Sequence, residues 1–360
     1  MKVALWFSDP PKTGHGRYNE NLINAMPNAL AIRYFSSRFG SVDTYPRETK
    51  VKGPMSFDLP FRSEIILNRA FQPFVSKYFF QSRKDIGLIH YTSQHERPFF
   101  SDSLKEIATV HDLTALKSVD SGMNDRIYSL TISRNIMKIL ELDDIIVNSN
   151  FIKREIMDLG YNGNIHMIHH CASPIFKPVN DKKMLRERLG IPVDKYVVLS
   201  VSSGSSRKNL GIIPKTMKIL GKDFMLARVG PSIGAESEIS FSGVNDNVLA
   251  NLYAASDVLF FPSRAEGFGS PMVESLSSGL PVVASDIPIT REVLGDAGIF
   301  AEKDDPFQYA DLIRNSIMGA DKEANKCLER SVEFSFDVFR KRYLNLYENL
   351  LGKTAPIEIR

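Results

Sequence analysis

The sequence of 360 residues has little cysteine, little net charge and no long apolar run. Its two cysteines, Cys171 and Cys327, are too few for a disulfide framework, which favours a reducing compartment. No apolar run approaches the ~18 residues of a membrane-spanning helix, and the run from Val3 to Phe7 is too short for a signal peptide. The net charge of +3 is too small to indicate nucleic-acid binding. We therefore expect a cytoplasmic protein with no nucleic-acid partner.

Length and composition favour two α/β domains. The chain is 43% hydrophobic and 24% charged, as in ordinary globular proteins, and its length suits two cores of ~170 residues each. Short apolar runs such as Val258 to Phe261 and Val282 to Ala284 are bounded by turn residues and alternate with helix-like segments. This pattern is typical of buried parallel strands in doubly wound sheets.

The segment 31–84 combines basic and aromatic residues. It contains ten basic and four acidic side chains, together with aromatic residues such as Phe71, Phe74 and Tyr78. Such a segment can dock on an anionic membrane surface or receive a lipid-phosphate acceptor. The alternative, an aromatic stripe facing the core below a solvated basic face, stays open.

The stretch from Ser263 to Ser285 carries the strongest chemical signal. Glu266 and Glu274 lie on either side of a turn, Gly267-Phe268-Gly269-Ser270-Pro271, that predicts a helix with Ser270 as N-cap and Pro271 in its first position. In a strand-loop-helix-strand unit, ligands bind beyond the carboxyl end of the first strand, where the helix N-terminus favours an anion. Either glutamate alone fits a solvated charge or a favourable helix-dipole contact. Together they suit two sets of sugar hydroxyls, because a carboxylate accepts hydrogen bonds from two neighbouring hydroxyls.

This stretch resembles the Glu-x7-Glu signature of retaining glycosyltransferases of family GT4. The resemblance implies a GT-B fold, in which two Rossmann-like domains face each other across a cleft. Residues 1–170, with a crossover helix at 337–351, would form the acceptor-side domain, and residues 181–334 the nucleotide-sugar domain. Residues 171–180 would form the linker.

Three further motifs agree with that resemblance. Gly14, Gly16, Arg17 and Tyr18 resemble the family's loop over the donor diphosphate, whereas a dinucleotide fingerprint would need a third glycine. His111, at the end of an apolar run, resembles the histidine that faces the donor sugar. Arg207 and Lys208 precede a predicted helix and resemble the diphosphate-binding loop. A surface turn, a structural histidine and a solvated basic loop are the respective alternatives.

Other positions give weaker predictions. The turn at Val244 resembles the base-binding turn, where backbone groups hold the nucleobase. His90 and His95 are candidates for the acceptor site. The nine residues 230–238 are too few for a comfortable parallel crossover. The histidines and the cysteine between 165 and 171 suggest a metal site, but neighbouring strand residues face opposite sides, so we predict no metal ligands.

The resemblance implies a metal-independent, retaining transfer of a hexose from a nucleoside diphosphate sugar to a glycan or polyprenyl-linked (lipid-linked) acceptor. His111, Glu266, Arg207 and Lys208 would act in catalysis, and Glu274 would hold the ribose. No cofactor is expected, and GDP-mannose is slightly favoured over UDP-sugars as donor. A position at the inner membrane face follows if 31–84 meets lipid. The alternatives are a non-catalytic nucleotide- or glycan-binding protein and a nucleotide-sugar epimerase of the same fold.

Overall fold

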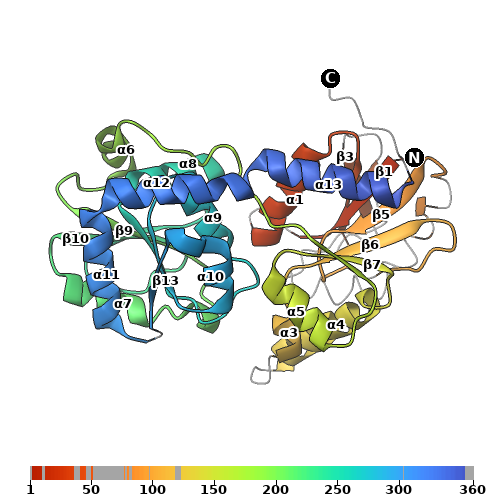
Figure 1. The fold of residues 1–360 in the computed structure, drawn as a ribbon, viewed down its shortest axis with the longest axis horizontal. Helices are drawn as coiled ribbons and strands as arrows, with labels where there is room; N and C mark the ends of the chain where they lie inside the picture. Colours follow the sequence, from red (N-terminus) through yellow and green to blue (C-terminus); the bar gives the residue numbers. More distant parts are fainter. Residues whose placement is uncertain are drawn as a thin grey trace. The chain divides into compact units, whose positions relative to one another are not determined.

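The chain forms two compact units, each built on one sheet. A computed structural model describes residues 2–9, 13–35, 41–45, 50–51, 77, 79–80, 83–96, 98–117, 123–302 and 304–352. The first unit comprises Met1–His169 and Phe339–Arg360, and the second comprises His170–Val338 (Figure 1). The C-terminal residues from Phe339 onward thus belong to the unit formed by the N-terminal residues.

The sheet of the first unit has eight described strands in the order β4-β3-β2-β1-β5-β6-β7-β8. The strands are β1 (Lys2–Phe7), β2 (Leu30–Phe35), β3 (Ser41–Tyr45), β4 (Lys50–Val51), β5 (Ile86–Tyr91), β6 (Lys105–Val110), β7 (Asp144–Val147) and β8 (Asn164–Met167). From β2 to β8 all neighbours are parallel, whereas β3 and β4 add an antiparallel edge. Sequence reasoning missed this edge. The short connections on both sides of β3 suit hairpins, because parallel pairing needs a longer crossover.

The described helices of the first unit lie on both sides of that sheet (Figure 1). They are α1 (Gly14–Ala25), α3 (Thr114–Lys117), α4 (Met123–Ile139), α5 (Asn150–Asp158) and most of α13 (Phe336–Leu350). Ile132 and Ile136 of α4 pack with Trp6 and Tyr91 in one core cluster. On α13, Tyr343 and Tyr347 are buried and reach His90 and Tyr18, which fixes this helix on the first unit.

The second unit has a six-stranded parallel sheet in the order β11-β10-β9-β12-β13-β14. Its strands are β9 (Tyr196–Val201), β10 (Phe224–Val229), β11 (Glu238–Phe241), β12 (Val258–Phe261), β13 (Val282–Ser285) and β14 (Gly298–Ala301). Its helices are α6 (Lys182–Leu189), α7 (Ile212–Leu220), α8 (Asp246–Ala255), α9 (Ser270–Ser277), α10 (Pro288–Leu294), α11 (Pro306–Met318) and α12 (Ala320–Ser331). Short 3-10 turns cover Ser206–Lys208, Gly295–Ala297 and Val332–Phe334.

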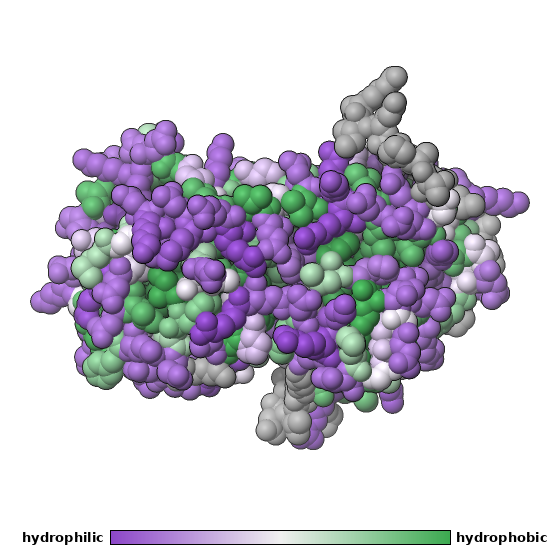
Figure 2. All heavy atoms as spheres, viewed as in Figure 1, coloured by the Kyte–Doolittle hydropathy of each residue, from purple (hydrophilic) through white to green (hydrophobic). Residues whose placement is uncertain are grey.

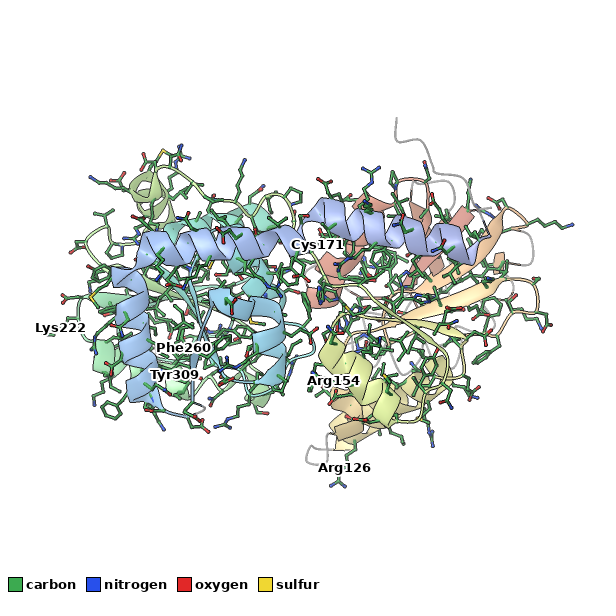
Figure 3. All side chains as sticks on the ribbon, in the orientation of Figure 1. Arg126, Arg154, Cys171, Lys222, Phe260 and Tyr309 are labelled. Atoms are coloured by element: carbon green, nitrogen blue, oxygen red, sulfur yellow. The ribbon has the colours of Figure 1, made fainter. Side chains whose placement is uncertain are left out.

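Successive side chains of a strand point to opposite faces of the sheet, so the second unit has a core on each face. Phe260 of β12 packs against Tyr309 of α11, with ring centroids 4.8 Å apart, in a cluster shared with α7 (Figure 3). Its neighbour Phe261 points to the opposite face, where α9 begins. The doubly wound arrangement therefore places the start of α9 directly against the end of β12.

The connection 230–238 differs from expectation. Although only eight residues separate β10 from β11, the two strands pair in parallel. The buried Arg228 explains how so short a crossover is held, because its guanidinium donates to the carbonyls of Ser200, Ser202, Val229 and Pro231. Gly230 and Gly234 adopt positive φ, which permits the sharp reversals.

The visible surface is mostly hydrophilic, with apolar residues scattered among the polar ones (Figure 2). Among the described helices, none is both long and apolar enough to cross a membrane. Much of the basic and aromatic segment 31–84, including Phe71, Phe74 and Tyr78, lies outside the described residues. Its proposed contact with lipid stays a prediction.

Candidate functional site

The second unit brings Arg207, Lys208 and Glu266 together. Arg207 Nη1 donates to Oε2 of Glu266 at 3.0 Å, and Lys208 Nζ donates to Oε1 at 2.5 Å. The glutamate side chain is only 4% exposed, whereas Arg207 is 31% exposed and Lys208 11%. One buried carboxylate therefore pairs with two cations that still reach solvent, and the group keeps a net positive charge.

Local backbone geometry explains this meeting. The 3-10 turn Ser206–Lys208 follows β9, the loop of Glu266 follows β12, and these two strands are parallel neighbours in the sheet. The amide of Arg264 donates to the carbonyl of Arg207 at 2.8 Å and joins the two loops. The three side chains thus lie at the carboxyl edge of the sheet, where ligands bind in open α/β folds.

The start of α9 depends on a glycine. Gly269, and not the expected Ser270, is the N-cap, with φ +88, a left-handed conformation that L side chains rarely adopt. A Cβ at this position would lie 2.5 Å from Cε of Met272. Pro271 consequently takes the second helical position instead of the predicted first, still within the turn whose amides lack partners in the helix. Gly267 and Phe268 are buried, and the Phe268 ring contacts His170 and Phe334.

Glu274 lies inside the second unit and is 3% exposed. The hydroxyl of Tyr253 on α8 donates to its Oε2 at 2.8 Å. Sequence reasoning did not single out Tyr253, because one aromatic residue on an apolar helix face gives no functional signal. The hydrogen bond fixes the orientation of the second glutamate of the pair.

Val244 is half-buried between β11 and α8. Gly243 before it has φ +64, and Asn245 after it caps α8 by accepting from the amide of Val248. The residue therefore lies in a turn directly before a helix N-terminus, where backbone groups are available to a ligand.

In the first unit, the glycines Gly14 and Gly16 belong to the first turn of α1 rather than to a separate loop. Thr13 is the N-cap and accepts from the amide of Gly16 at 3.0 Å. Gly14 is exposed and Arg17 half-buried, and a Cβ at Gly14 would meet open space. This helix start follows β1, so it too lies at the carboxyl edge of its sheet.

His111 directly follows β6 and is 3% exposed. Its Nε2 lies 2.8 Å from the carbonyl oxygen of Thr92, which can only accept, so Nε2 carries a proton. Its ring stacks on that of His15, with centroids 4.4 Å apart, and meets Tyr18 edge-on at 4.7 Å. The predicted histidine and the predicted glycine turn are therefore neighbours.

His90 has the environment of a core residue. It is fully buried, and its two ring nitrogens lie 2.6 Å from the Tyr347 hydroxyl and 2.7 Å from Oγ1 of Thr109. Burial lowers the pKa of His90 to about 3. Both nitrogens are engaged inside the unit, so this geometry offers no acceptor contact.

His95 belongs to a cluster with Asp9 and His15. Oδ1 of Asp9 lies 2.8 Å from Nδ1 of His95 and 3.3 Å from Nδ1 of His15. Burial acts to raise the pKa of Asp9, but the two imidazoles outweigh it and hold that pKa well below its ordinary value. Asp9 was missed, although it follows β1 at the edge where strand-end ligands were expected.

The ligand atoms of Asp9, His15 and His95 all lie within 4.8 Å of one another, so they could hold a metal ion. This group differs from the rejected 165–171 cluster. There, His166 pairs with Asp144 at 2.6 Å and Cys171 is buried, with burial raising the pKa of its thiol to about 12.

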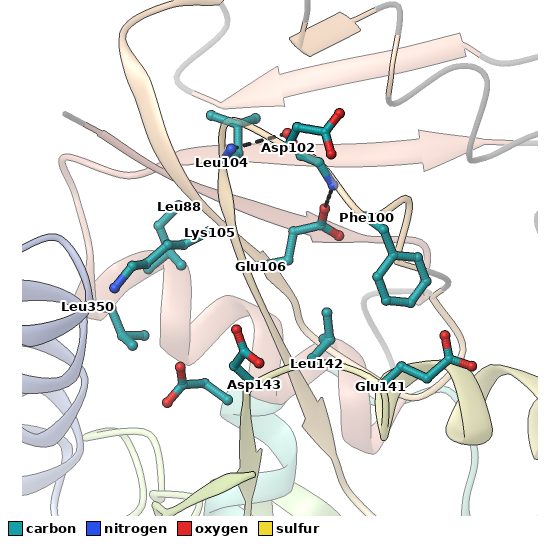
Figure 4. Close-up of a pocket in the computed structure, with 12 residues that line it drawn as sticks. Leu88, Phe100, Asp102, Leu104, Lys105, Glu106, Glu141, Leu142, Asp143 and Leu350 are labelled. Carbon is teal, nitrogen blue, oxygen red and sulfur yellow. Dashed lines mark hydrogen bonds between the residues drawn. The ribbon is translucent and has the colours of Figure 1, made fainter.

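A cavity of about 340 Å³ lies near the amino-terminal ends of β6 and β7 (Figure 4). Lys105 and Asp144 begin these strands, and Glu106 and Asp102 line the space with Leu350 of α13. Glu106 holds the adjoining loop by accepting from Tyr91 and from the amides of Phe99 and Ser101. The carboxylate of Glu106 therefore has a structural role in this loop. The cavity lies at the edge of the sheet opposite to His111.

Comparisons with known proteins agree with the geometry of the second unit. Residues 181–331 match the family model described as glycosyl transferases group 1. A D-inositol 3-phosphate glycosyltransferase from Xylanimonas cellulosilytica is 28% identical over 159 residues, which cover 39% of this chain and 38% of that protein. The O-antigen chain mannosyltransferase RfbU from Salmonella typhimurium is 24% identical over 238 residues, which cover 62% of this chain and 63% of RfbU. The matched parts thus span less than two thirds of either relative.

The fold comparison covers nearly the whole chain. The structure of sucrose-phosphate synthase from Thermosynechococcus elongatus superimposes with a TM-score of 0.77 at 19% identity, covering 98% of this chain and 100% of that one. At this identity the likeness concerns the fold alone. The chain therefore has the GT-B fold, and its residues 181–331 match the model of the group 1 glycosyl transferases.

Proposed function

We propose that the chain is a retaining hexosyltransferase that moves a mannose- or glucose-type sugar from a nucleoside diphosphate donor to a glycan or lipid-linked acceptor. The observation that carries this proposal is the contact of Glu266 with both Arg207 and Lys208 beside the start of α9. The single carboxylate balances only one of the two positive charges, so a more highly charged diphosphate can displace it from both cations.

The exchange has a chemical consequence. When the donor diphosphate takes the two cations, Glu266 is released from them and can accept hydrogen bonds from sugar hydroxyls. Arg207, Lys208 and the N-terminus of α9 then stabilise the charge that grows on the leaving diphosphate. This arrangement supplies the electrostatic stabilisation without a metal ion, so we propose metal-independent transfer.

The remaining residues take the roles that the family resemblance implies. Glu274, oriented by Tyr253, holds the ribose, and the backbone near Val244 holds the base. His111 faces the donor sugar, and Gly14, Gly16 and Arg17 contact the diphosphate. The bond between the anomeric carbon and the phosphate oxygen breaks as the acceptor oxygen bonds the same face. The acceptor's proton passes to the departing phosphate.

The donor assignment rests on the relatives. RfbU is named an O-antigen chain mannosyltransferase, which supports a mannose-type sugar and slightly favours GDP-mannose over UDP-sugars. A polyprenyl- or other lipid-linked glycan as acceptor would agree with the basic and aromatic composition of 31–84. The corresponding location is the cytoplasm, with peripheral attachment to the inner face of the membrane.

The test is a donor screen with and without candidate acceptors. The purified chain is incubated with GDP-mannose, UDP-glucose and related donors in the presence of EDTA. We expect release of the nucleoside diphosphate to rise with a suitable acceptor, and the product to keep the donor's anomeric configuration. Donor binding without turnover across the screen would favour a non-catalytic protein. Conversion of the donor sugar into its epimer without acceptor would favour an epimerase. An inverted product would contradict the retaining mechanism.

A further inference from the structure

The cluster of Asp9, His15 and His95 has no part in the transfer chemistry proposed above. It lies entirely in the first unit, where β1 and β5 end and α1 begins. Asp9 is 2% exposed, and burying a carboxylate costs free energy unless both of its oxygens are hydrogen-bonded or bound to a cation. Its presence there calls for a specific partner.

Asp9 is only half satisfied. Its Oδ1 contacts both imidazoles, but its Oδ2 is buried and has no hydrogen-bond partner among the described residues. Buried polar atoms almost always have a partner, which can be a protein group, a water molecule or an ion. The orphaned oxygen belongs to a carboxylate whose other oxygen already contacts two imidazole nitrogens.

The distances suit a shared ion. Two ligand atoms that each lie ~2.1 Å from a zinc ion are about 3.0–3.4 Å apart for angles between octahedral and tetrahedral. Nδ1 of His15 lies 3.3 Å from Oδ1 of Asp9, which is long for an N–H···O bond but matches this range. Nδ1 of His95 lies 2.8 Å from the same oxygen, so a small rotation of that ring would suffice.

Neighbouring residues hold His95 and His15 in place, and the site stays accessible to solvent. The turn of His95 is fixed by Ser93 and by Asn135, whose side-chain amide donates to the His95 carbonyl at 2.8 Å. His15 is held by stacking on His111. The side chain of His15 is 21% exposed, against 8% for His95 and 1% for Asp9, so an ion and a solvent ligand can approach past it.

We propose that Asp9, His15 and His95 form a binding site for one divalent first-row transition-metal ion, with zinc as the first probe. Two imidazoles and one carboxylate, with open positions, are a donor set that such ions favour over Mg²⁺ or Ca²⁺. The transfer reaction proposed above does not use this ion, so the two proposals can fail separately.

The test measures metal binding directly. The full chain, prepared without a polyhistidine tag and stripped with EDTA, is titrated with zinc against a chromophoric chelator, and separately with cobalt while its visible absorption is recorded. We expect one tightly bound ion per chain and a cobalt spectrum of low coordination number. Magnesium should not compete.

Three substitutions locate the site. His15→Asn, His95→Asn and Asp9→Asn should each weaken zinc binding by about tenfold or more. Loss of a residue that only hydrogen-bonds to a metal ligand already lowers metal affinity by about this factor, and loss of the ligand itself should cost at least as much. His166→Asn is the matched control, because His166 pairs with a single carboxylate, that of Asp144, and should leave zinc affinity unchanged.

Circular dichroism and thermal unfolding check each variant. If Asp9→Asn does not fold, the half-buried His15 still decides the question. The proposal is overturned if stoichiometric binding is absent, or if His15→Asn and His95→Asn bind zinc as tightly as the unaltered chain.

Discussion

Lys208 Nζ lies 2.5 Å from Oε1 of Glu266, and the same carboxylate accepts from Arg207 through its other oxygen. The carboxylate thus contacts both cations, and the group keeps a net positive charge. A bare pair of cations at a sheet edge would be solvated and mobile, whereas this carboxylate holds both in fixed positions. In the proposed reaction the two cations are thus already in place when the donor diphosphate arrives, and only their contacts with Glu266 have to break, which favours electrostatic stabilisation of the leaving group.

Removing either cation should mainly reduce turnover. We predict that Lys208→Ala and Arg207→Ala each lower kcat about 10²–10³-fold, the usual cost of losing one preorganised donor at a developing charge. Lys326→Ala is the matched control, since Lys326 also pairs with a glutamate, Glu323, at 3.0 Å, but on the surface of α12. Initial rates of nucleoside diphosphate release measure the effect. Unchanged kcat in both variants would contradict the assigned role.

Loss of the second glutamate should act on donor binding instead. We predict that Glu274→Ala raises the donor KM, because the ribose hydroxyls lose their acceptor, while kcat changes less. Tyr253→Phe should raise KM by a smaller factor, since it removes only the 2.8 Å hydrogen bond that orients Glu274.

Tyr309→Phe provides the control for Tyr253→Phe. Tyr309 is also buried in the second unit, and its hydroxyl lies 2.8 Å from that of Ser285. Both variants lose one buried hydroxyl, so a general loss of stability would affect them alike. A donor KM that rises equally in both would show that Tyr253 has no specific role.

Much of this site could be predicted because its residues follow short apolar strands. Glu266 and His111 stand where β12 and β6 end, and the strand period and turn residues mark those ends in the sequence. Parallel strands bring their carboxyl ends to one edge, so the meeting of Arg207 and Lys208 with Glu266 follows from topology.

The rest depends on contacts that leave no local trace. Tyr253 acts on Glu274 from a neighbouring helix, and Asp9 meets His95 across 86 residues of sequence. Arg228 holds an unusually short crossover through four carbonyl groups, which no spacing rule anticipates. The antiparallel edge of β3 and β4 was missed because edge strands are short and carry no continuous apolar run.

The buried His90 should make stability depend on pH. Its pKa is about 3 in the folded chain, where burial disfavours the charged form, against about 6.5 when unfolded. The unfolded chain therefore binds more protons between these values, and stability falls as pH falls. His90 should remove on the order of 2 kcal/mol of unfolding free energy between pH 6.5 and pH 5.

Urea unfolding at both pH values tests this expectation, with His90→Gln for comparison. The variant loses stability at pH 7 because the contacts with Tyr347 and Thr109 change, but its further loss on acidification should be smaller. Asp9 does not contribute between pH 6.5 and pH 5. Its pKa is lowered below its ordinary value in the folded chain, so it affects the unfolding free energy only at lower pH. Identical pH dependence in both proteins would rule out His90 as the responsible group.

The start of α9 gives a prediction about backbone strain. Gly269→Ala should lower the unfolding free energy by about 2–4 kcal/mol, of which ~1–2 kcal/mol comes from placing a Cβ in the left-handed region. The remainder comes from the contact with Met272, whose Cε lies 2.5 Å from the position that the alanine Cβ would occupy. Met272 is fully buried, and the ring of Phe261 lies 3.4 Å from the same Cβ, so the methyl group has little room to move.

Gly190→Ala separates the two contributions. Gly190 ends α6 with φ +69, and a Cβ there would meet no atom within 4 Å, so only the backbone cost applies. Chemical denaturation of both variants measures the difference. Equal losses would mean that Met272 moves aside freely. A larger loss at Gly269, together with a raised donor KM, would show that packing between β12 and α9 fixes the helix start at which the proposed diphosphate binds.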